Sequence, residues 1–297
     1  MNNKLSGHLQ VIFATFLIAG SFIATADISA QLHPLSLNLM RFAIATMLMV
    51  PFVVFKKGNL TKLLRVIPRS LVISFFYCGY FACNFIAMLS TSTINVGSIY
   101  TLTPLVTALF SIIIFKQPLT LKSLLIYGLG MLGTLWVVFG GDMTKLSLFD
   151  LNNGDVIFSL GVLCMSGYTI AMKLLYRNDD VQVMTFTNLL GGVFWMLLAT
   201  VVMQVPLEWR SLDSSYYPSM LYLAIAATFL TSYLYQKAST ILKPVNVSAY
   251  IYLNPLCVAL LSLLLFGEMT SGLIWIGIGI STFATFYLHF ADYRAST

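Results

Sequence analysis

The chain of 297 residues is 59% hydrophobic and only 9% charged, whereas an average soluble domain carries about 25% charged residues. A water-soluble protein of this size could not bury so much apolar surface, so the composition excludes an ordinary soluble domain and predicts an all-α membrane protein. The net charge of +6 then indicates basic loops beside a bilayer, and no nucleic-acid binding.

Ten apolar segments are each long enough to cross a bilayer, for which a helix needs about 20 residues. In chain order they cover residues 8–27, 34–55, 68–90, 94–115, 121–140, 154–174, 183–204, 217–237, 245–266 and 271–291. The sequence therefore predicts ten transmembrane helices that are joined by short loops.

Basic residues give the orientation of these segments. If the N-terminus lies inside and the chain alternates, all of the 16 Lys and Arg residues except Lys145, Arg210 and Arg41 fall in inner loops and ends. Cytoplasmic loops of membrane proteins carry such an excess of basic residues. We therefore expect a multi-pass protein of the bacterial inner (plasma) membrane, with both the N- and the C-terminus in the cytoplasm.

The first apolar segment has an alternative interpretation. Lys4, the apolar run after it and the small residues Ala24, Thr25 and Ala26 would also fit a cleaved signal peptide. Cleavage would leave nine spans and would remove the counterpart of the sixth span in the repeat described next. We therefore expect the first segment to remain as a span.

The chain contains an internal repeat. Residues 94–117 align with residues 245–268, and the identical pairs include Asn95 with Asn246 and Pro104 with Pro255. Earlier segments also align, through the pairs Gly7 with Gly154, Gly20 with Gly167 and Ala24 with Ala171. We predict two five-helix repeats, residues 1–145 and 146–297. Because five is an odd number, the second copy enters the membrane from the opposite side, which is the inverted-topology design of many secondary transporters.

Two stretches carry a resemblance to a known family. Ala87–Gln117 and Ala238–Glu268 each run from an Ala through small and polar residues to a Leu-x-Pro, followed by an apolar run to a Phe. On these stretches, and on Arg41 with Phe42 early in the second span, the chain resembles the EamA-type ten-helix family of the drug/metabolite transporter superfamily. In the first half Lys116 and Gln117 stand where the family has Gly-Glu.

The resemblance covers nearly the whole chain and implies a secondary transporter of small metabolites that works by alternating access. Many members of the family are exporters, so the first functional hypothesis is an exporter of amino acids or related metabolites. An uptake carrier for a planar, vitamin-like solute such as riboflavin is the alternative, because several spans carry tyrosines. The expected partners are a small-molecule substrate and the lipid bilayer, and the oligomeric state stays open.

Candidate cavity residues are polar or aromatic side chains that share helical faces in spans three, four, six, eight and nine. The same residues would also serve helix–helix contacts, or anchor at the membrane interface in the case of tyrosine. The candidates are Tyr77, Tyr80, Asn84, Asn95, Ser98, Thr101, Tyr168, Thr231, Tyr235, Asn246, Tyr250 and Asn254.

Three further residues have two interpretations each. Pro104 and Pro255 interrupt helical hydrogen bonding and would free the carbonyls of Tyr100 and Ile251, so they are either packing kinks or gate hinges. Arg41 is the one basic residue that we place inside a span. It either braces the fold or attracts an anionic group of the substrate.

Other function classes lack their chemistry in this sequence. A membrane-embedded enzyme would need paired Asp clusters or a His-Glu-x-x-His motif, and an ATP-driven pump would need a phosphate-binding loop. None of these three motifs is present in the sequence. No Asp or Glu lies at a predicted midplane. The four cysteines show no metal-ligand spacing, so we expect free thiols, no metal site and no cofactor. They are Cys78, Cys83, Cys164 and Cys257.

Overall fold

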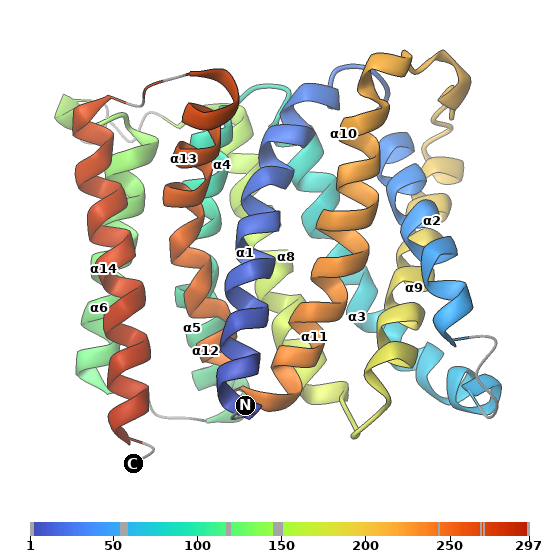
Figure 1. The fold of residues 1–297 in the computed structure, drawn as a ribbon, viewed down its shortest axis with the longest axis horizontal. Coiled ribbons are helices and arrows are strands. Elements are labelled where there is room, and N and C mark those ends of the chain that lie inside the picture. The colour runs from blue at the N-terminus through green and yellow to red at the C-terminus, as the bar shows by residue number, and fades with distance from the viewer. Residues whose placement is uncertain are drawn as a thin grey trace.

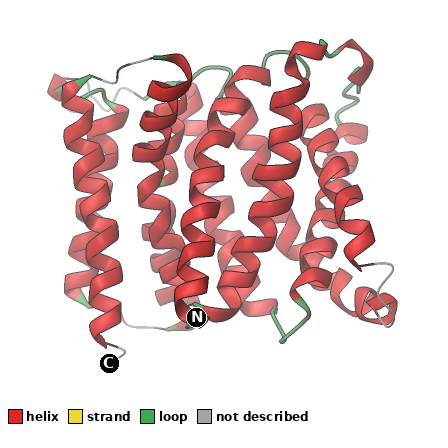
Figure 2. Cartoon of the chain, in the orientation of Figure 1, coloured by secondary structure: helices red, strands yellow, loops and turns green. Residues whose placement is uncertain are grey.

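The computed structural model of the protein describes residues 3–53, 59–116, 120–144, 151–242, 244–267, 269 and 271–295. These residues form helices and turns, without a strand among them. The helices stand side by side in a bundle whose N- and C-termini lie at the same end (Figures 1 and 2). We call this the terminal end and the opposite one the far end. The predicted all-α fold is confirmed for the described residues.

The first half of the chain forms five helical segments, of which the fourth is broken in two. They are α1 (Asn3–Ile28), α2 (Pro34–Val53), α3 (Asn59–Ala87), α4 (Thr93–Tyr100) with α5 (Thr103–Phe115), and α6 (Leu121–Val138). The helix α3 begins nine residues before the predicted span 68–90. Its first turns carry Lys62 and Arg65, so the helix continues beyond the apolar stretch that the prediction followed.

The second half of the chain contains more interruptions. Its elements are α8 (Asn153–Leu175), α9 (Val181–Val202), the 3₁₀ turns η1 (Trp209–Ser211) and η2 (Ser214–Tyr216), α10 (Tyr217–Leu221), the π-helix η3 (Tyr222–Leu230), α11 (Thr231–Ile241), α12 (Pro244–Ala249), the 3₁₀ turn η4 (Tyr250–Leu253), α13 (Asn254–Phe266) and α14 (Gly272–Ala295). The predicted segment 217–237 is thus one rod that changes its winding twice.

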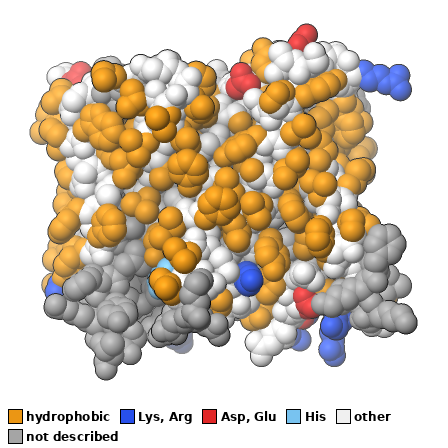
Figure 3. All heavy atoms as spheres, in the orientation of Figure 1, with side chains coloured by type: hydrophobic (Ala, Val, Ile, Leu, Met, Phe, Trp, Pro, Cys, Tyr) orange, Lys and Arg blue, Asp and Glu red, His pale blue; other side chains and the backbone are white. Residues whose placement is uncertain are grey.

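Seven helical stretches among the described residues are long and apolar enough to cross a membrane by length and composition, and α6 and α14 carry shorter apolar stretches, Leu124–Val138 and Gly272–Ala284. On the face that Figure 3 shows, apolar side chains lie over much of the described surface of the bundle. Leu264 is 77% exposed, Ile113 74% and Val202 71%. An outer surface of this kind is stable in lipid and unfavourable in water.

Both halves break a helix just before a proline. Pro104 and Pro255 stand in the first turn of α5 and α13, where the missing N–H costs no hydrogen bond. The residue before each proline also bonds the carbonyl that the break would leave free. The Thr103 hydroxyl donates to the Tyr100 carbonyl at 2.7 Å, and the Asn254 amide donates to the Ile251 carbonyl at 2.9 Å. The freed carbonyls are therefore satisfied within the helix, and no water is needed to bond them.

Neighbouring helices come from both halves of the chain. The helix α3 packs on α8 and α9, α1 packs on α11 and α13, and α2 packs on α9. At one edge of the bundle α6 lies against α14. There Gly133 and Gly277 face each other so closely that a Cβ on Gly277 would lie 2.6 Å from the Gly133 carbonyl oxygen. Close backbone approach through glycine is typical of helix pairs in membranes.

Candidate functional site

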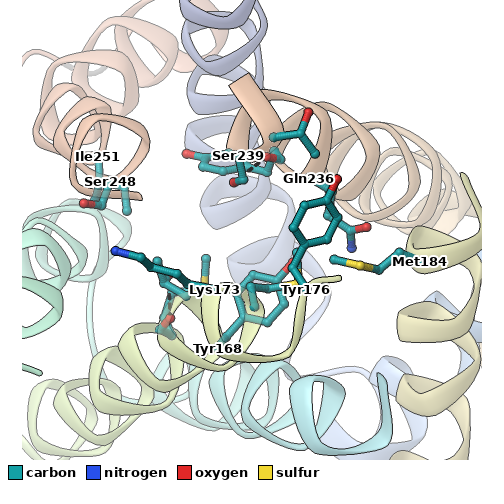
Figure 4. A pocket seen from close by; sticks show the side chains of 13 residues that line it. Tyr168, Lys173, Tyr176, Met184, Gln236, Ser239, Ser248 and Ile251 are labelled. Carbon is teal, nitrogen blue, oxygen red and sulfur yellow. Dashed lines mark hydrogen bonds between the residues drawn. The ribbon is translucent and has the colours of Figure 1, made fainter. Parts of the chain in front are cut away.

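A cavity of about 230 Å³ opens between α8, α9, α11 and the broken segment α12–η4. We call it the vestibule. Lys173 and Tyr176 at the end of α8, and Ser239 and Thr240 near the end of α11, form its rim at the terminal end. Figure 4 shows Tyr168, Lys173 and Tyr176 on one side, with Gln236 and Ser239 across the opening. The remaining lining residues are Met165, Thr169, Met172, Met184, Tyr235, Ser248 and Ile251.

Polar groups at the rim of the vestibule are held in place by neighbours. The Thr185 hydroxyl lies 2.8 Å from the Gln236 Oε1 atom and fixes that side-chain amide. Burial and the nearby Asp179 carboxylate raise the pKa of the Tyr176 hydroxyl. Tyr176 is therefore a neutral hydrogen-bonding group at neutral pH.

A second cavity of about 20 Å³, which we call the chamber, lies deeper in the bundle. It shares Met165, Tyr168 and Tyr235 with the vestibule, so the two cavities are neighbours, and we call them together the path. The volume of the chamber is enough for about one water molecule. Its other lining residues are Ile18, Ser21, Tyr77, Tyr80, Phe81, Tyr100, Ala227, Thr231 and Ser232.

Five of the twelve residues that line the chamber are tyrosines. Tyr77 stacks on Tyr168 with ring centroids 4.7 Å apart and an angle of 25° between the planes, and Tyr80 lies 5.4 Å from Tyr100. The Tyr77 hydroxyl bonds the Ser232 hydroxyl at 2.9 Å. The chamber is thus lined by aromatic rings with a bonded pair of hydroxyls, which suits an apolar or aromatic solute.

Five of the twelve residues predicted to line a cavity lie around this path. They are Tyr77, Tyr80, Tyr168, Thr231 and Tyr235. Sequence reasoning did not single out Tyr100, Ser232, Gln236 or Lys173, which also line it. Tyr100 could have been found from the sequence, because it stands next to the candidate Thr101 and its carbonyl is the one that Pro104 frees.

The other predicted residues lie elsewhere. Asn84 is 1% exposed and lines neither cavity, Ser98 is fully buried, and Thr101 bonds the Thr134 hydroxyl of α6. Asn254 caps a carbonyl, as described above. Asn246 belongs to α12, but its side chain lies outside the described part of the structure.

At the far end, Asp155 joins α8 to the turn between α3 and α4. This carboxylate is 2% exposed and accepts hydrogen bonds from the Thr91 hydroxyl at 2.5 Å and from the Asn95 amide at 3.2 Å. It also completes a capping box with Asn152 at the start of α8. We call the contact of Asp155 with Thr91 and Asn95 the far latch. Asp155 stands at the start of the predicted span 154–174, where the sequence pattern gives no sign of its partners.

At the terminal end, His8 of α1 meets Tyr250 of η4. The His8 Nδ1 atom lies 2.8 Å from the Tyr250 hydroxyl, and the two rings form an edge contact with centroids 5.9 Å apart. This pair, which we call the near contact, ties the start of the chain to the second broken helix, beside the vestibule.

Arg41 is fully buried behind the chamber wall. Its Nε donates to the Thr228 hydroxyl, its Nη2 donates to the Ala227 carbonyl at 3.1 Å, and its guanidinium carbon lies 4.2 Å from the Phe81 ring centroid. Thr228 and Ala227 belong to the π-helix η3, and the Thr228 hydroxyl in turn bonds the carbonyl of Leu223 at 2.7 Å. Single π-turns are frequent at functional sites.

Within the described residues, no group of three or more His, Cys, Asp or Glu side chains is placed to hold a metal ion. All four cysteines are free. The path offers aromatic, thioether, hydroxyl and amide groups together with the cation of Lys173, which are the means to bind a small organic solute.

Comparisons with known proteins agree with this arrangement. The profile of the EamA-like transporter family matches residues 5–139 and again residues 152–290. The chain is 25% identical over 295 residues to an uncharacterized transporter of Archaeoglobus fulgidus, covering 97% of this chain and 98% of that protein. It is 27% identical over 158 residues to the uncharacterized transporter YyaM of Bacillus subtilis, a match that spans about half of each chain, 52% and 51%. One solved crystal structure has the same fold, with a TM-score of 0.72, 17% identity and 99% of both chains covered.

Proposed function

Because the chain belongs to the EamA-like transporter family, we propose that it is a secondary carrier that exports amino acids or related small metabolites by alternating access. The observation that carries this proposal is the vestibule, which opens toward one end, together with the tyrosine-lined chamber next to it deeper in the bundle. A path of that kind, open toward one end, is what a carrier needs in one of its two states.

An inverted repeat of two five-helix halves, with ten spans, is part of the proposal. In its support, the family profile matches two successive stretches of nearly equal length. The packing is also paired, because contacts recur when the two halves are exchanged. The contact of α3 with α8 corresponds to that of α11 with α1, and the contact of α5 with α8 corresponds to that of α13 with α1. The boundary between residues 145 and 146 falls in the gap between the two matched stretches.

Two contacts at opposite ends fit the same scheme. The first matched stretch begins at residue 5 and the second at residue 152, and His8 stands as many residues after the first start as Asp155 stands after the second. His8 makes the near contact at the terminal end, and Asp155 makes the far latch. In an inverted repeat, equivalent residues lie toward opposite ends of the molecule. We therefore propose that opening the far end requires release of Asp155, while Pro104 and Pro255 mark the hinges of the broken helices.

The terminal end faces the cytoplasm in this proposal. Arg69 and Arg177 lie there with Lys173, and basic residues favour the cytoplasmic side of a bacterial inner membrane. A vestibule on that side would admit a solute from the cytoplasm, which suits export. The stacked pair Tyr77 and Tyr168 favours a second candidate, an uptake carrier for a planar solute such as riboflavin.

Counterflow into liposomes tests the carrier function. Vesicles that contain the purified protein are loaded with one unlabelled solute class at a time, and uptake of the labelled solute is measured for amino acids, flavins, nucleosides and organic acids. We expect one class to accumulate and the variant Tyr168→Ala to lose that activity. The matched variant Tyr217→Ala, at an exposed residue of the far end, should keep it. Absence of counterflow for every class would refute the proposal.

A further inference from the structure

The vestibule carries a cation. Among the described lining residues of the vestibule and the chamber, Lys173 is the one charged side chain and none is Asp or Glu. The Asp179 carboxylate near Tyr176 is paired with Arg69 at 2.7 Å. The Lys173 ammonium lies 4.3 Å from the centroid of the Phe115 ring. Because a surface cation attracts anions before they bind, the entrance favours a negatively charged solute.

A second cation stands directly behind the chamber. Two of the residues that Arg41 contacts, Phe81 and Ala227, are themselves part of the chamber wall. Arg41 is fully buried and has no ion-pair partner among the described residues. Its Nη1 atom makes no hydrogen bond there, although Nε and Nη2 do.

A role in bracing the fold explains only part of this geometry. The bonds to Thr228 and Ala227 hold α2 against η3, and they use two of the three guanidinium nitrogens. The N–H groups of Nη1 stay buried without an acceptor. An uncompensated charge away from water is unfavourable, and the attraction of an opposite charge grows as the local dielectric falls. An anion in the chamber would compensate Arg41.

Resting on the proposed carrier function, we propose that the solute is an organic anion, a carboxylate on an apolar and preferably aromatic body. Lys173 draws the carboxylate into the vestibule, and Arg41 holds it through Nη1 once Phe81 shifts aside. The faces of Tyr168 and Tyr235 and the side chain of Met165 contact the apolar body. An ammonium group on the solute adds nothing to this recognition.

Binding of three matched probes to the purified native protein tests the assignment. The probes are hydrocinnamate, its primary amide and phenylpropylamine, which share one aromatic body and differ in charge. We expect hydrocinnamate to bind about tenfold or more tightly than the amide, because hydrogen bonds between ionised groups are stronger than those to a neutral group, and phenylpropylamine to bind most weakly. Equal affinity of the three probes, or preference for the amine, overturns the assignment.

Variants of Arg41 separate recognition from bracing. Arg41→Gln should lower the affinity for hydrocinnamate to that for the amide, whereas Arg41→Lys, which keeps the charge, should retain the preference. Lys122→Met, which removes an exposed cation that lies 5.2 Å from the Tyr287 ring centroid, serves as the control and should change neither affinity. If Arg41 only braces the fold, both Arg41 variants will lower the unfolding temperature and neither will alter the preference between the probes.

The counterflow experiment distinguishes failure of this inference from failure of the carrier function. If the protein moves only solutes that lack a carboxylate, the anion assignment is wrong and the carrier function stands. If it moves nothing, both are wrong.

Discussion

Removal of the far latch should open the chamber toward the far end. Asp155 accepts hydrogen bonds from Thr91 and Asn95, which lie on another part of the chain. Asp155→Ala removes both bonds. Hydrogen bonds to charged groups contribute about 1.5–3 kcal/mol, and about 1.4 kcal/mol corresponds to a factor of ten in an equilibrium constant. We therefore expect the ratio of far-open to far-closed molecules to rise about tenfold or more.

Thiol labelling in the chamber measures this change. In a protein without its native cysteines, Thr231→Cys places one thiol in the chamber, at a position that is 2% exposed. A membrane-impermeant thiol reagent is added to spheroplasts, where it meets the far end. Asp155→Ala should raise the labelling rate about tenfold. The control Asp155→Asn keeps an oxygen that accepts from Thr91 and should have a smaller effect. An unchanged rate in Asp155→Ala would refute the latch.

Two further predictions concern stability. Gly277→Ala should push α14 away from α6 and lower the unfolding temperature, because its Cβ would lie 2.6 Å from the Gly133 carbonyl oxygen. The control Gly279→Ala, on the same helix, meets nothing within 4 Å and should leave the unfolding temperature unchanged. Equal unfolding temperatures of the two variants in a thermal melt would contradict the packing. Arg69 forms two bonds with the Asp179 carboxylate, at 2.7 and 3.0 Å, and neither side chain is more than 14% exposed. Arg69→Gln should therefore destabilise the protein by about 1–3 kcal/mol. In a double-mutant cycle with Asp179→Asn, most of that loss should appear as coupling energy between the two residues. Additive effects of the two substitutions would show that the pair is not coupled.

The helical segments could be predicted from the sequence because lipid imposes a simple rule. Every backbone group must bond within its own segment, so each apolar stretch of sufficient length becomes a helix. The ends of the helices are harder to predict. The helix α3 extends back to Asn59 because polar residues can continue a helix beyond the apolar stretch. The winding of η3 as a π-helix left no pattern in the hydrophobicity of residues 222–230.

The cavity residues were predictable only in part, since helical spacing shows which residues share a face and not what that face meets. Tyr77 and Tyr80 on α3 meet the chamber, whereas Asn84, one turn further on the same face, is buried away from both cavities. Asn95 lies on a polar stripe of α4, and its partner Asp155 belongs to a helix that is distant in sequence. Such pairings depend on how the helices pack, which a single sequence does not reveal.

Access to the chamber from each side of the membrane tests the central claim most directly. The single thiol of Thr231→Cys, with Asp155 intact, is labelled by an impermeant reagent in spheroplasts and in inverted vesicles, with and without the transported solute. An alternating-access carrier should be labelled from both sides, faster from the terminal end where the vestibule opens, and the solute should protect the thiol in both preparations. Labelling from the terminal end alone, without protection by any solute, would mean that the path is a closed pocket and would contradict the carrier function.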